Sequence, residues 1–270
     1  MTASPLLYER TGPVATITLN APQRRNALTP EMLCRLCDAF QAFSADASLR
    51  VAIVTGAGDL AFCAGGDLGR TIPLLTGERQ AEDDWDRRLL GDPQVLAVSM
   101  LRDYPLHKPV VAAINGSCMA AGFELMLGTD VRLAATQAVF ALPEVKRGVV
   151  PFAGSMVRLP RQIAHSAAME IMLTGEPFTA AEAHRIGLVN RTVPARRLMA
   201  EARAIAERIA ENGPLAVHAV KRTVAATSGL PLAEAWPVED EAWRTVLATE
   251  DAREGPRAFM ERRVAVFRGC

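Results

Sequence analysis

Hydrophobic positions along the chain follow the two-residue period of strands in some segments and the helical period in others. Residues 14–20 alternate apolar and polar side chains as a half-buried strand does, and residues 51–56 form a short apolar run that ends at glycine. Between them, residues 29–45 repeat with helical spacing, with Thr29 and Pro30 suited to cap and begin a helix. The pattern predicts a strand, a helix and a second strand in succession.

The alternation continues through the middle of the chain. The further predicted strands are residues 109–115, 131–135 and 139–142, and the predicted helices follow Gly116 and cover 154–173. Strands that alternate with helices predict an α/β fold in which helices cover the sheets.

From about residue 195 the pattern is helical only. Residues 196–211, 214–227 and 232–249 each carry helical periodicity, with proline or glycine between them. We therefore expect a core over residues 1–195 and a helical region over residues 196–270.

Composition narrows the classes of partner. The 270 residues include 30 basic and 30 acidic side chains, so their charges cancel and leave no electrostatic footprint for nucleic acid or an anionic membrane surface. The longest apolar run, residues 109–127, is interrupted by Asn115, Gly116 and Glu124, which argues against a membrane span. The first residues lack a secretory pattern. These features predict a cytoplasmic protein that binds neither nucleic acid nor membrane.

The five cysteines lack the paired spacing of a structural zinc site. Cys34 and Cys37 fall within the helical pattern of residues 29–45, so we interpret them as core positions rather than a redox pair. Reduced thiols agree with a cytosolic location.

Glu124 is unusual because it stands in a run of apolar and small residues. An unpaired carboxylate away from water is unfavourable, so such a group finds a partner or has a raised pKa. One explanation is structural: Glu124 accepts backbone N–H bonds or pairs with Arg132 or Lys146. The other is catalytic, and the residues alone leave both open.

Three turns supply further candidate chemistry. Glu144 follows Pro143 and so begins a turn, where a surface role is the simpler explanation. The turns at Gly65-Gly66-Asp67 and Ala120-Ala121-Gly122 consist of small residues that leave backbone N–H groups unshielded. Two such groups aimed at one point would form an oxyanion hole, although for each turn by itself a tight turn is the more frequent explanation.

The order of these segments resembles the enoyl-CoA hydratase/isomerase, or crotonase, superfamily over nearly the whole chain. The resemblance rests on several short motifs in the right order and spacing. They are Arg25-Asn-Ala-Leu28, Ala61-Phe-Cys-Ala-Gly-Gly-Asp67, Lys108-Pro-Val-Val-Ala-Ala-Ile-Asn-Gly116, Phe123-Glu124, Phe140-Ala-Leu-Pro-Glu144, Leu173-Thr-Gly-Glu and Glu254-Gly-Pro-Arg-Ala-Phe259.

The resemblance implies a spiral of β-β-α units followed by helices that build trimers, often paired into hexamers. It implies an acyl-CoA thioester as substrate and no cofactor or metal, since coenzyme A is part of the substrate. The N–H groups of Gly66 and Ala121 would hold the thioester oxygen. Glu144 would transfer a proton at C2, while Glu124 would hold and activate the water. Other positions implied to bind substrate or CoA are Arg25, Ala27, Leu28, Ala64, Asp67, Phe152, Phe259 and Arg262.

Some positions depart from the family pattern. Met119-Ala-Ala-Gly122 replaces a run of glycines, so one oxyanion donor is expected to be an alanine N–H. Phe152 replaces a glycine and is expected to reshape the pocket. The segment after Asp67 is longer than in common hydratases, and we expect residues 70–105 to form a mobile cover over the acyl pocket.

Three alternatives remain at this stage. An isomerase of the same family can work with one carboxylate, placed as Glu144 is. A non-catalytic or RNA-binding relative is disfavoured by the neutral charge. A Ser-His-Asp hydrolase is disfavoured because the chain has no G-x-S-x-G motif. Hydration, or the reverse dehydration, is the favoured activity because both glutamates are present.

Overall fold

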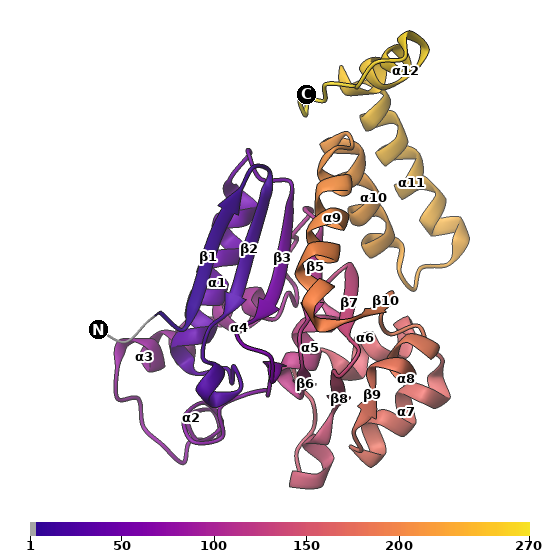
Figure 1. The fold of residues 1–270 in the computed structure, drawn as a ribbon. Coiled ribbons are helices and arrows are strands. Elements are labelled where there is room, and N and C mark those ends of the chain that lie inside the picture. Colours follow the sequence, from indigo (N-terminus) through magenta and orange to yellow (C-terminus); the bar gives the residue numbers. More distant parts are fainter. Residues whose placement is uncertain (1–3) are drawn as a thin grey trace.

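The computed structural model describes residues 4–270, and its longest strands form one six-stranded sheet, here called the large sheet (Figure 1). Its order is β1-β2-β3-β5-β7-β10, with β1 antiparallel to β2 and the other neighbours parallel. Its strands are β1 (Leu6–Thr11), β2 (Val14–Leu19), β3 (Val51–Gly56), β5 (Val110–Ile114), β7 (Val131–Ala135) and β10 (Arg191–Val193).

A four-stranded sheet, here called the small sheet, has the order β4-β6-β8-β9. Its strands are β4 (Ala61–Cys63), β6 (Ser117–Met119), β8 (Val139–Ala141) and β9 (Phe178–Thr179). In three successive units, β3 with β4, β5 with β6, and β7 with β8, the chain adds one strand to the large sheet and the next to the small sheet. This repetition is the expected spiral of β-β-α units, and the α/β prediction is confirmed.

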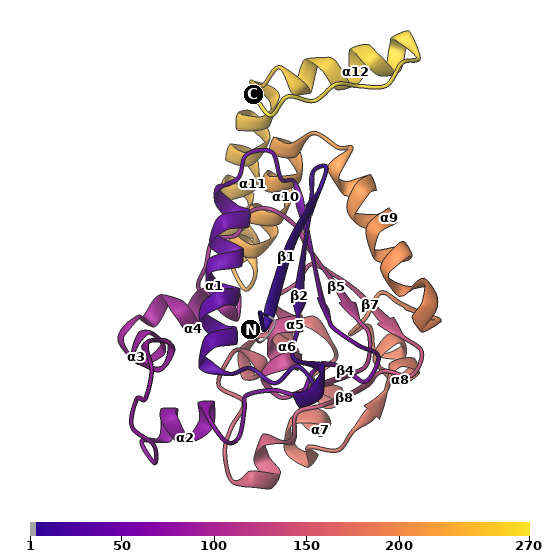
Figure 2. The same ribbon diagram turned by 60° about the vertical axis from the view of Figure 1, so that its left-hand side comes forward.

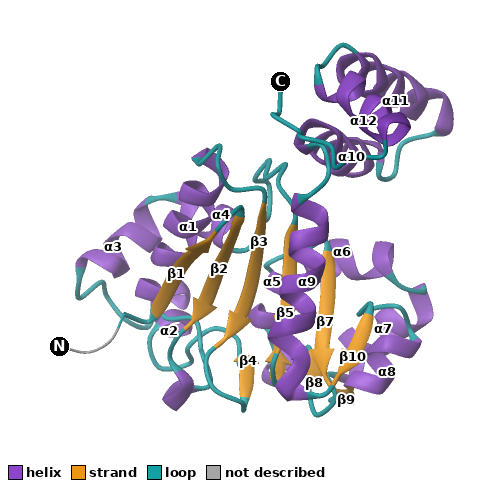
Figure 3. Cartoon of the chain, turned by 45° about the horizontal axis from the view of Figure 1, so that its top comes forward, coloured by secondary structure: helices purple, strands orange, loops and turns teal. Residues whose placement is uncertain are grey.

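Both faces of the large sheet are buried. On β5, Val110 and Ala112 pack into the main core together with α1 (Pro30–Ala45), while Val111 and Ala113 face a second apolar cluster with α9 (Leu198–Ala210). Figure 3 shows α9 lying along the strands. A strand covered on both faces needs apolar residues at every position, which explains the unbroken run in β5.

The remaining helices connect the strands. They are η1 (Pro22–Arg24), α2 (Thr71–Thr76), α3 (Asp84–Gly91), α4 (Pro93–Ser99), α5 (Ala121–Leu127), η2 (Pro143–Arg147), α6 (Ser155–Gln162), α7 (His165–Thr174), α8 (Ala180–Arg185) and η3 (Ala195–Arg197). Among the helices of residues 4–270, none combines the length and the hydropathy needed to cross a membrane.

The predicted helix over residues 29–45 is confirmed as α1, whose first turn is capped by the Thr29 hydroxyl accepting from the Met32 N–H. Cys34 and Cys37 are fully buried on this helix and unpaired with each other, as expected of core positions. Burial raises the pKa of the Cys34 thiol to about 11, which keeps the thiol protonated at neutral pH.

Two predictions about helices need correction. Residues 154–173 are divided into α6 and α7, because Ile163 has extended backbone that ends the first helix. Residues 70–105, for which the sequence predicted no helix or strand, contain three helices, and Val95 and Val98 of α4 are fully buried in the main core. The portion of this segment that forms α4 is therefore anchored in the core. Motion of the segment as a cover over the acyl pocket stays a prediction.

Helices α10 (Pro214–Thr227), α11 (Leu232–Leu247) and α12 (Asp251–Glu261) project from the sheets (Figures 1 and 2). The sequence predicted α10 and α11 but missed α12. Large apolar side chains on these helices are exposed, namely Val220, Val224, Leu232, Trp236, Trp243, Leu247, Phe259 and Met260. The boundary between residues 195 and 196 stays a prediction; α9 lies against the large sheet, whereas α10 to α12 project from it.

Candidate active site

The candidate groups gather at one edge of the small sheet. Strands β4, β6 and β8 are parallel neighbours, so their carboxyl ends lie side by side. Gly66 follows β4, Ala121 and Glu124 follow β6, and Glu144 follows β8. The carboxyl ends of parallel strands are the usual place for ligand sites in α/β proteins. Residues far apart in the sequence are thus brought together by sheet topology.

Close backbone approach explains the glycines in the first two turns. A Cβ atom added to Gly65 would lie 2.7 Å from the Ala120 Cβ and 3.5 Å from the Ala121 nitrogen. A Cβ at Gly122 would lie 2.5 Å from the Cys63 Cβ. The two turns can touch only because these positions lack side chains.

The N–H groups of Gly66 and Ala121 belong to these touching turns. Within residues 4–270, neither group donates a hydrogen bond. Ala120, which directly precedes Ala121, has φ 50° and ψ −127°, a conformation that glycine adopts far more readily than alanine, and its own N–H donates to the Ala141 carbonyl at 3.0 Å. A backbone conformation of this kind costs about 1–3 kcal/mol and is common at functional sites.

Glu124 is buried on α5, with 1% of its surface exposed. Its Oε1 accepts hydrogen bonds from the N–H groups of Ala153 at 2.8 Å and Ser155 at 3.0 Å. Burial raises its pKa, against the lowering effect of these two donors. The structural explanation is thus partly correct, since backbone N–H groups hold one oxygen. Pairing with Arg132 or Lys146 is absent from the described residues, because Arg132 bonds to carbonyls and Gln162 while Lys146 pairs with Glu176.

Glu144 lies in η2 directly after β8. Its Oε2 is buried and has no hydrogen-bond partner within residues 4–270. Burial, reinforced by the negative charge of Glu124, raises its pKa to about 7, while Arg147 opposes the shift. The surface-turn explanation is therefore wrong for this oxygen. A carboxyl that has one buried, unpartnered oxygen and a pKa near 7 can either give or take a proton at neutral pH.

We expect the raised pKa of Glu144 to change how the stability of the protein depends on pH. Between its usual range and about 7, folded Glu144 keeps a proton that the unfolded chain has lost, so stability falls as pH rises through that window. The melting temperature of the Glu144→Gln protein should therefore gain on the wild type from pH 5 to pH 7.5 and then level off. Glu170→Gln, at an exposed glutamate of α7, provides the control. A constant difference across this range would contradict the shift.

The motif at residues 25–28 runs beside the Gly66 turn. The Leu28 N–H donates to the Gly65 carbonyl at 2.8 Å, the Asp67 N–H donates to the Leu28 carbonyl at 3.0 Å, and the Ala64 N–H donates to the Arg25 carbonyl at 3.0 Å. Ala27 lies within the same segment. The five predicted positions Arg25, Ala27, Leu28, Ala64 and Asp67 are thus brought together next to the candidate donors.

Two asparagines that were not predicted as site residues anchor this region. The fully buried Asn26 accepts from the Ala21 N–H and donates to the Ala61 carbonyl at 2.8 Å. Asn115 accepts from the Gly56 N–H and donates to the same Ala61 carbonyl at 3.1 Å. Both bonds fix the start of β4, from which the Gly66 turn emerges. The sequence signal for both was an amide side chain next to small and apolar residues in a motif of the family.

The remaining predicted positions are placed differently. Phe152 directly precedes Ala153, which binds Glu124, but its side chain is 47% exposed. Phe259 on α12 is 81% exposed, and Arg262 follows the same helix. Figure 1 shows α12 at the opposite end of the molecule from α5, so one chain does not bring Phe259 and Arg262 to the glutamates.

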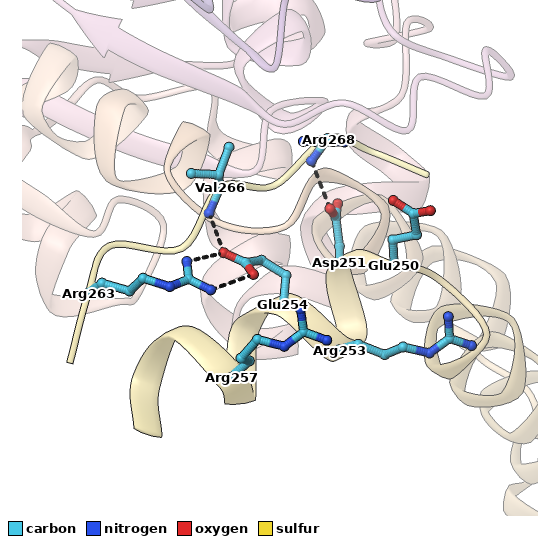
Figure 4. A pocket seen from close by; sticks show the side chains of 8 residues that line it. All are labelled: Glu250, Asp251, Arg253, Glu254, Arg257, Arg263, Val266 and Arg268. Atoms are coloured by element: carbon cyan, nitrogen blue, oxygen red, sulfur yellow. Dashed lines mark hydrogen bonds and ion pairs between the residues drawn. The ribbon is translucent and has the colours of Figure 1, made fainter. Parts of the chain in front are cut away.

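A hollow of about 510 Å³ lies beside α12 (Figure 4), and neither Glu124 nor Glu144 is among the residues that line it. Its acidic side chains already hold the end of the chain: Glu254 pairs with Arg263, and Asp251 accepts from the N–H groups of Arg268 and Gly269. This hollow therefore contains structural ion pairs, and none of the sequence-predicted groups lines it.

Comparisons with known proteins cover nearly the whole chain. Residues 9–269 match the family described as Enoyl-CoA hydratase/isomerase. Enoyl-CoA hydratase EchA19 of Mycobacterium tuberculosis is 38% identical over 261 residues, which cover 97% of this chain and 95% of that protein. Carnitinyl-CoA dehydratase of Salmonella typhi is 38% identical over 264 residues, covering 96% and 97%. A crystal structure of enoyl-CoA hydratase from Bacillus anthracis is similar with a TM-score of 0.88 at 34% identity, covering 98% of this chain and all of that one.

Proposed function

The chain belongs to the enoyl-CoA hydratase/isomerase family, and on that premise we propose that it is an enoyl-CoA hydratase, a hydro-lyase that adds water across the 2,3 double bond of a 2-enoyl-CoA thioester. The same site would catalyse the reverse dehydration. The relatives include both an enoyl-CoA hydratase and a carnitinyl-CoA dehydratase.

One observation carries the proposal. Two backbone N–H groups without a partner among residues 4–270, the buried carboxyl of Glu124 and the carboxyl of Glu144, whose Oε2 is buried, meet at the carboxyl ends of β4, β6 and β8, and both carboxyls have raised pKa values. Addition of water to a conjugated thioester needs donors for the oxygen that becomes negative, and acid and base groups for two protons. An isomerase needs the donors and one carboxyl, so the second buried carboxyl favours hydration.

The proposed reaction assigns one task to each group. Glu124 takes a proton from water while the water oxygen bonds to C3, and the electrons of the 2,3 double bond move onto the thioester oxygen. The N–H groups of Gly66 and Ala121 stabilise this enolate. Glu144 gives its proton to C2, and the proton taken by Glu124 then returns to Glu144. The prediction that no metal or cofactor is required is retained in this proposal.

The local geometry supports this division of work. Oε1 of Glu124 is fixed by the Ala153 and Ser155 N–H groups, which leaves Oε2 for a water molecule. Glu144 has a pKa of about 7, so at neutral pH a large fraction carries the proton needed at C2. Burial raises the pKa of both glutamates. At Glu124 the Ala153 and Ser155 N–H groups oppose this rise, whereas Oε2 of Glu144 has no donor within residues 4–270.

The predicted binding positions complete the substrate site in this proposal. Arg25, Ala27, Leu28, Ala64 and Asp67 would line the path of the CoA arm past the Gly66 turn. Phe152, next to the turn that holds Glu124, would limit the space near the reacting carbons. A half-exposed aromatic ring at this place is available for such contact.

We further propose that α10 to α12 mediate self-association as a trimer or a dimer of trimers. Their exposed apolar side chains, such as Trp243 at 61% and Phe259 at 81%, would be buried against neighbouring subunits. In such an assembly Phe259 and Arg262 would bind the CoA of a neighbouring subunit, which agrees with their distance from the glutamates of their own chain.

Loss of the Gly66 donor should be severe. Gly66→Pro removes the N–H, and we expect kcat/KM to fall by about 10²–10³-fold. Gly66→Ala is the matched control because it keeps the N–H and adds only a methyl group, 3.1 Å from the flexible end of Ile72. Melting temperatures establish that both proteins fold. Equal losses in the two variants would attribute the effect to crowding and remove Gly66 as a donor.

The proposed function is tested by loss of the enoyl-thioester absorbance over a series of 2-enoyl-CoA chain lengths, with 3-enoyl-CoA as the isomerase control. We expect turnover of at least one 2-enoyl-CoA by the purified enzyme. Turnover of 3-enoyl-CoA alone would replace the hydratase assignment with the isomerase.

A further inference from the structure

Asp86 is a fully buried carboxylate outside the proposed catalytic site. Its oxygens accept hydrogen bonds from Arg79 Nη1 at 2.5 Å and Nη2 at 2.9 Å, and from the Glu82 N–H at 3.0 Å. Arg70 Nη2 lies 3.5 Å away. Hydrogen bonds from Arg79 hold the pKa of Asp86 well below its usual range, so the side chain is ionised. A buried carboxylate that accepts several hydrogen bonds holds the segments that donate them in fixed relative positions.

Arg79 connects α3 to the beginning of α2. While it binds Asp86 on α3, its Nη2 also donates to the Arg70 carbonyl at 3.1 Å. Arg70 is the residue that precedes α2. A helix of only six residues is unstable without tertiary contacts, so the position of α2 depends on such bonds.

Helix α3 is anchored independently of this contact. Arg88 on α3 makes a two-point contact with Asp38 of α1, at 2.9 and 2.5 Å. The Arg35 guanidinium of α1 lies 4.9 Å from the ring centre of Trp85 on α3. Asp86 therefore joins α2 to an element that is already fixed to the core.

Helix α2 lies against the proposed oxyanion turn. The Cδ1 atom of Ile72 lies 3.1 Å from the position that a Cβ would take on Gly66. The Thr71 hydroxyl donates to the Leu28 carbonyl at 2.7 Å, and the Asp67 carboxylate accepts from the Arg70 N–H at 2.9 Å. An acyl group whose thioester oxygen binds the Gly66 N–H would have Ile72 as a neighbour.

We propose that Asp86 and Arg79 are positioning residues that hold α2, and with it Ile72, against the acyl group and thereby set the acyl-chain preference of the enzyme. The inference rests on the proposed hydratase function. It differs from a freely moving cover, because here the segment is held by a buried ion pair. The residues act through Ile72 and do not touch the substrate.

The test compares Asp86→Asn, Arg79→Gln and Ile72→Ala. The readout is the ratio of kcat/KM for a four-carbon and a ten-carbon 2-enoyl-CoA. We expect all three variants to shift this ratio in the same direction by about tenfold or more, the range that pocket contacts with methylene groups provide. Asp84→Asn is the matched control, since it breaks an exposed ion pair within α3, with Arg87, and leaves the contact of α3 with α1 in place; its ratio should stay within about twofold of the wild type.

Hydrogen exchange provides a readout that does not depend on activity. Backbone amides of residues 71–76 should exchange faster in Asp86→Asn and Arg79→Gln than in wild type or Asp84→Asn. If Asp86→Asn does not fold, Arg79→Gln carries the test, because Asp86 keeps the Glu82 N–H. Unchanged exchange together with an unchanged ratio would overturn the proposal. If the wild-type enzyme hydrates no 2-enoyl-CoA but the two variants still exchange faster, the result would support the role of Asp86 and Arg79 in holding α2 and would reject the proposed function instead.

Discussion

The Glu144→Gln protein should lose hydration and any side isomerisation together. Both reactions need a proton given to or taken from the carbon next to the thioester carbonyl, and the amide can do neither. We expect kcat to fall by at least about 10²–10⁴-fold, the usual contribution of an acid or base group. Initial rates with the best 2-enoyl-CoA and with 3-enoyl-CoA provide the measurement.

The structure indicates that this loss will not come from unfolding. Glu144 Oε2 makes no hydrogen bond within residues 4–270, so the substitution breaks none there, and the amide avoids burial of a charge. The variant should therefore melt at or above the wild-type temperature at pH 7.5. Normal turnover in the folded variant would exclude Glu144 as the group that serves C2.

The Glu124→Gln protein should be impaired more selectively. Hydration should fall by about 10²–10⁴-fold because the group that activates water is lost. Exchange of the C2 proton with solvent should survive in part, since Glu144 remains. Proton NMR of the hydration product 3-hydroxyacyl-CoA, incubated with the variant in heavy water, measures this exchange, and the hydration rate is measured separately with 2-enoyl-CoA.

Glutamine can keep the structural part of the Glu124 role. Its amide oxygen can accept the Ala153 and Ser155 N–H groups in place of Oε1, so the turn that carries them should remain. A protein that keeps its hydration rate but melts far below the wild type would assign Glu124 to structure only. A loss of hydration at an unchanged melting temperature supports its assignment to water.

The pair of variants also separates hydratase from isomerase. An isomerase needs Glu144 but tolerates the loss of Glu124, whereas a hydratase needs both. The two substitutions therefore test the hydratase assignment independently of each other.

The sequence predicted most of the long elements and missed most of the short ones for a physical reason. Strand β1 is as long as β2 but was missed, because only its first residue is buried and it shows no alternation, whereas the short β8 was predicted. Strands β2 and β3 and helices α1 and α10 have enough residues to display a period. Strands β4, β6 and β9 have two or three residues each, too few for any period, and their pairing depends on the sheet. Helix α12 contains Gly255 and Pro256, and Gly255 packs against Phe267, a contact that helical propensity cannot reveal.

For the site, the sequence indicated which residues carry chemistry but not what holds them. Glu124 was recognised because a carboxylate stood in an apolar run, yet its donors Ala153 and Ser155 are about thirty positions away and meet it only in the fold. Asp86 was not recognised, because it lies in a charged stretch over residues 82–88 and is nevertheless fully buried. Charge alone does not reveal which member of a cluster turns inward.

The most direct test of the account is the fate of solvent atoms in the product. The enzyme is given a 2-enoyl-CoA in water that contains oxygen-18 and deuterium, and the product is analysed by mass spectrometry and NMR. Hydration by the proposed route predicts one solvent oxygen at C3 and one deuterium at C2 of a 3-hydroxyacyl-CoA. Deuterium incorporation without solvent oxygen would indicate an isomerase, and solvent oxygen at the carboxyl carbon would indicate thioester hydrolysis; either result would contradict the account.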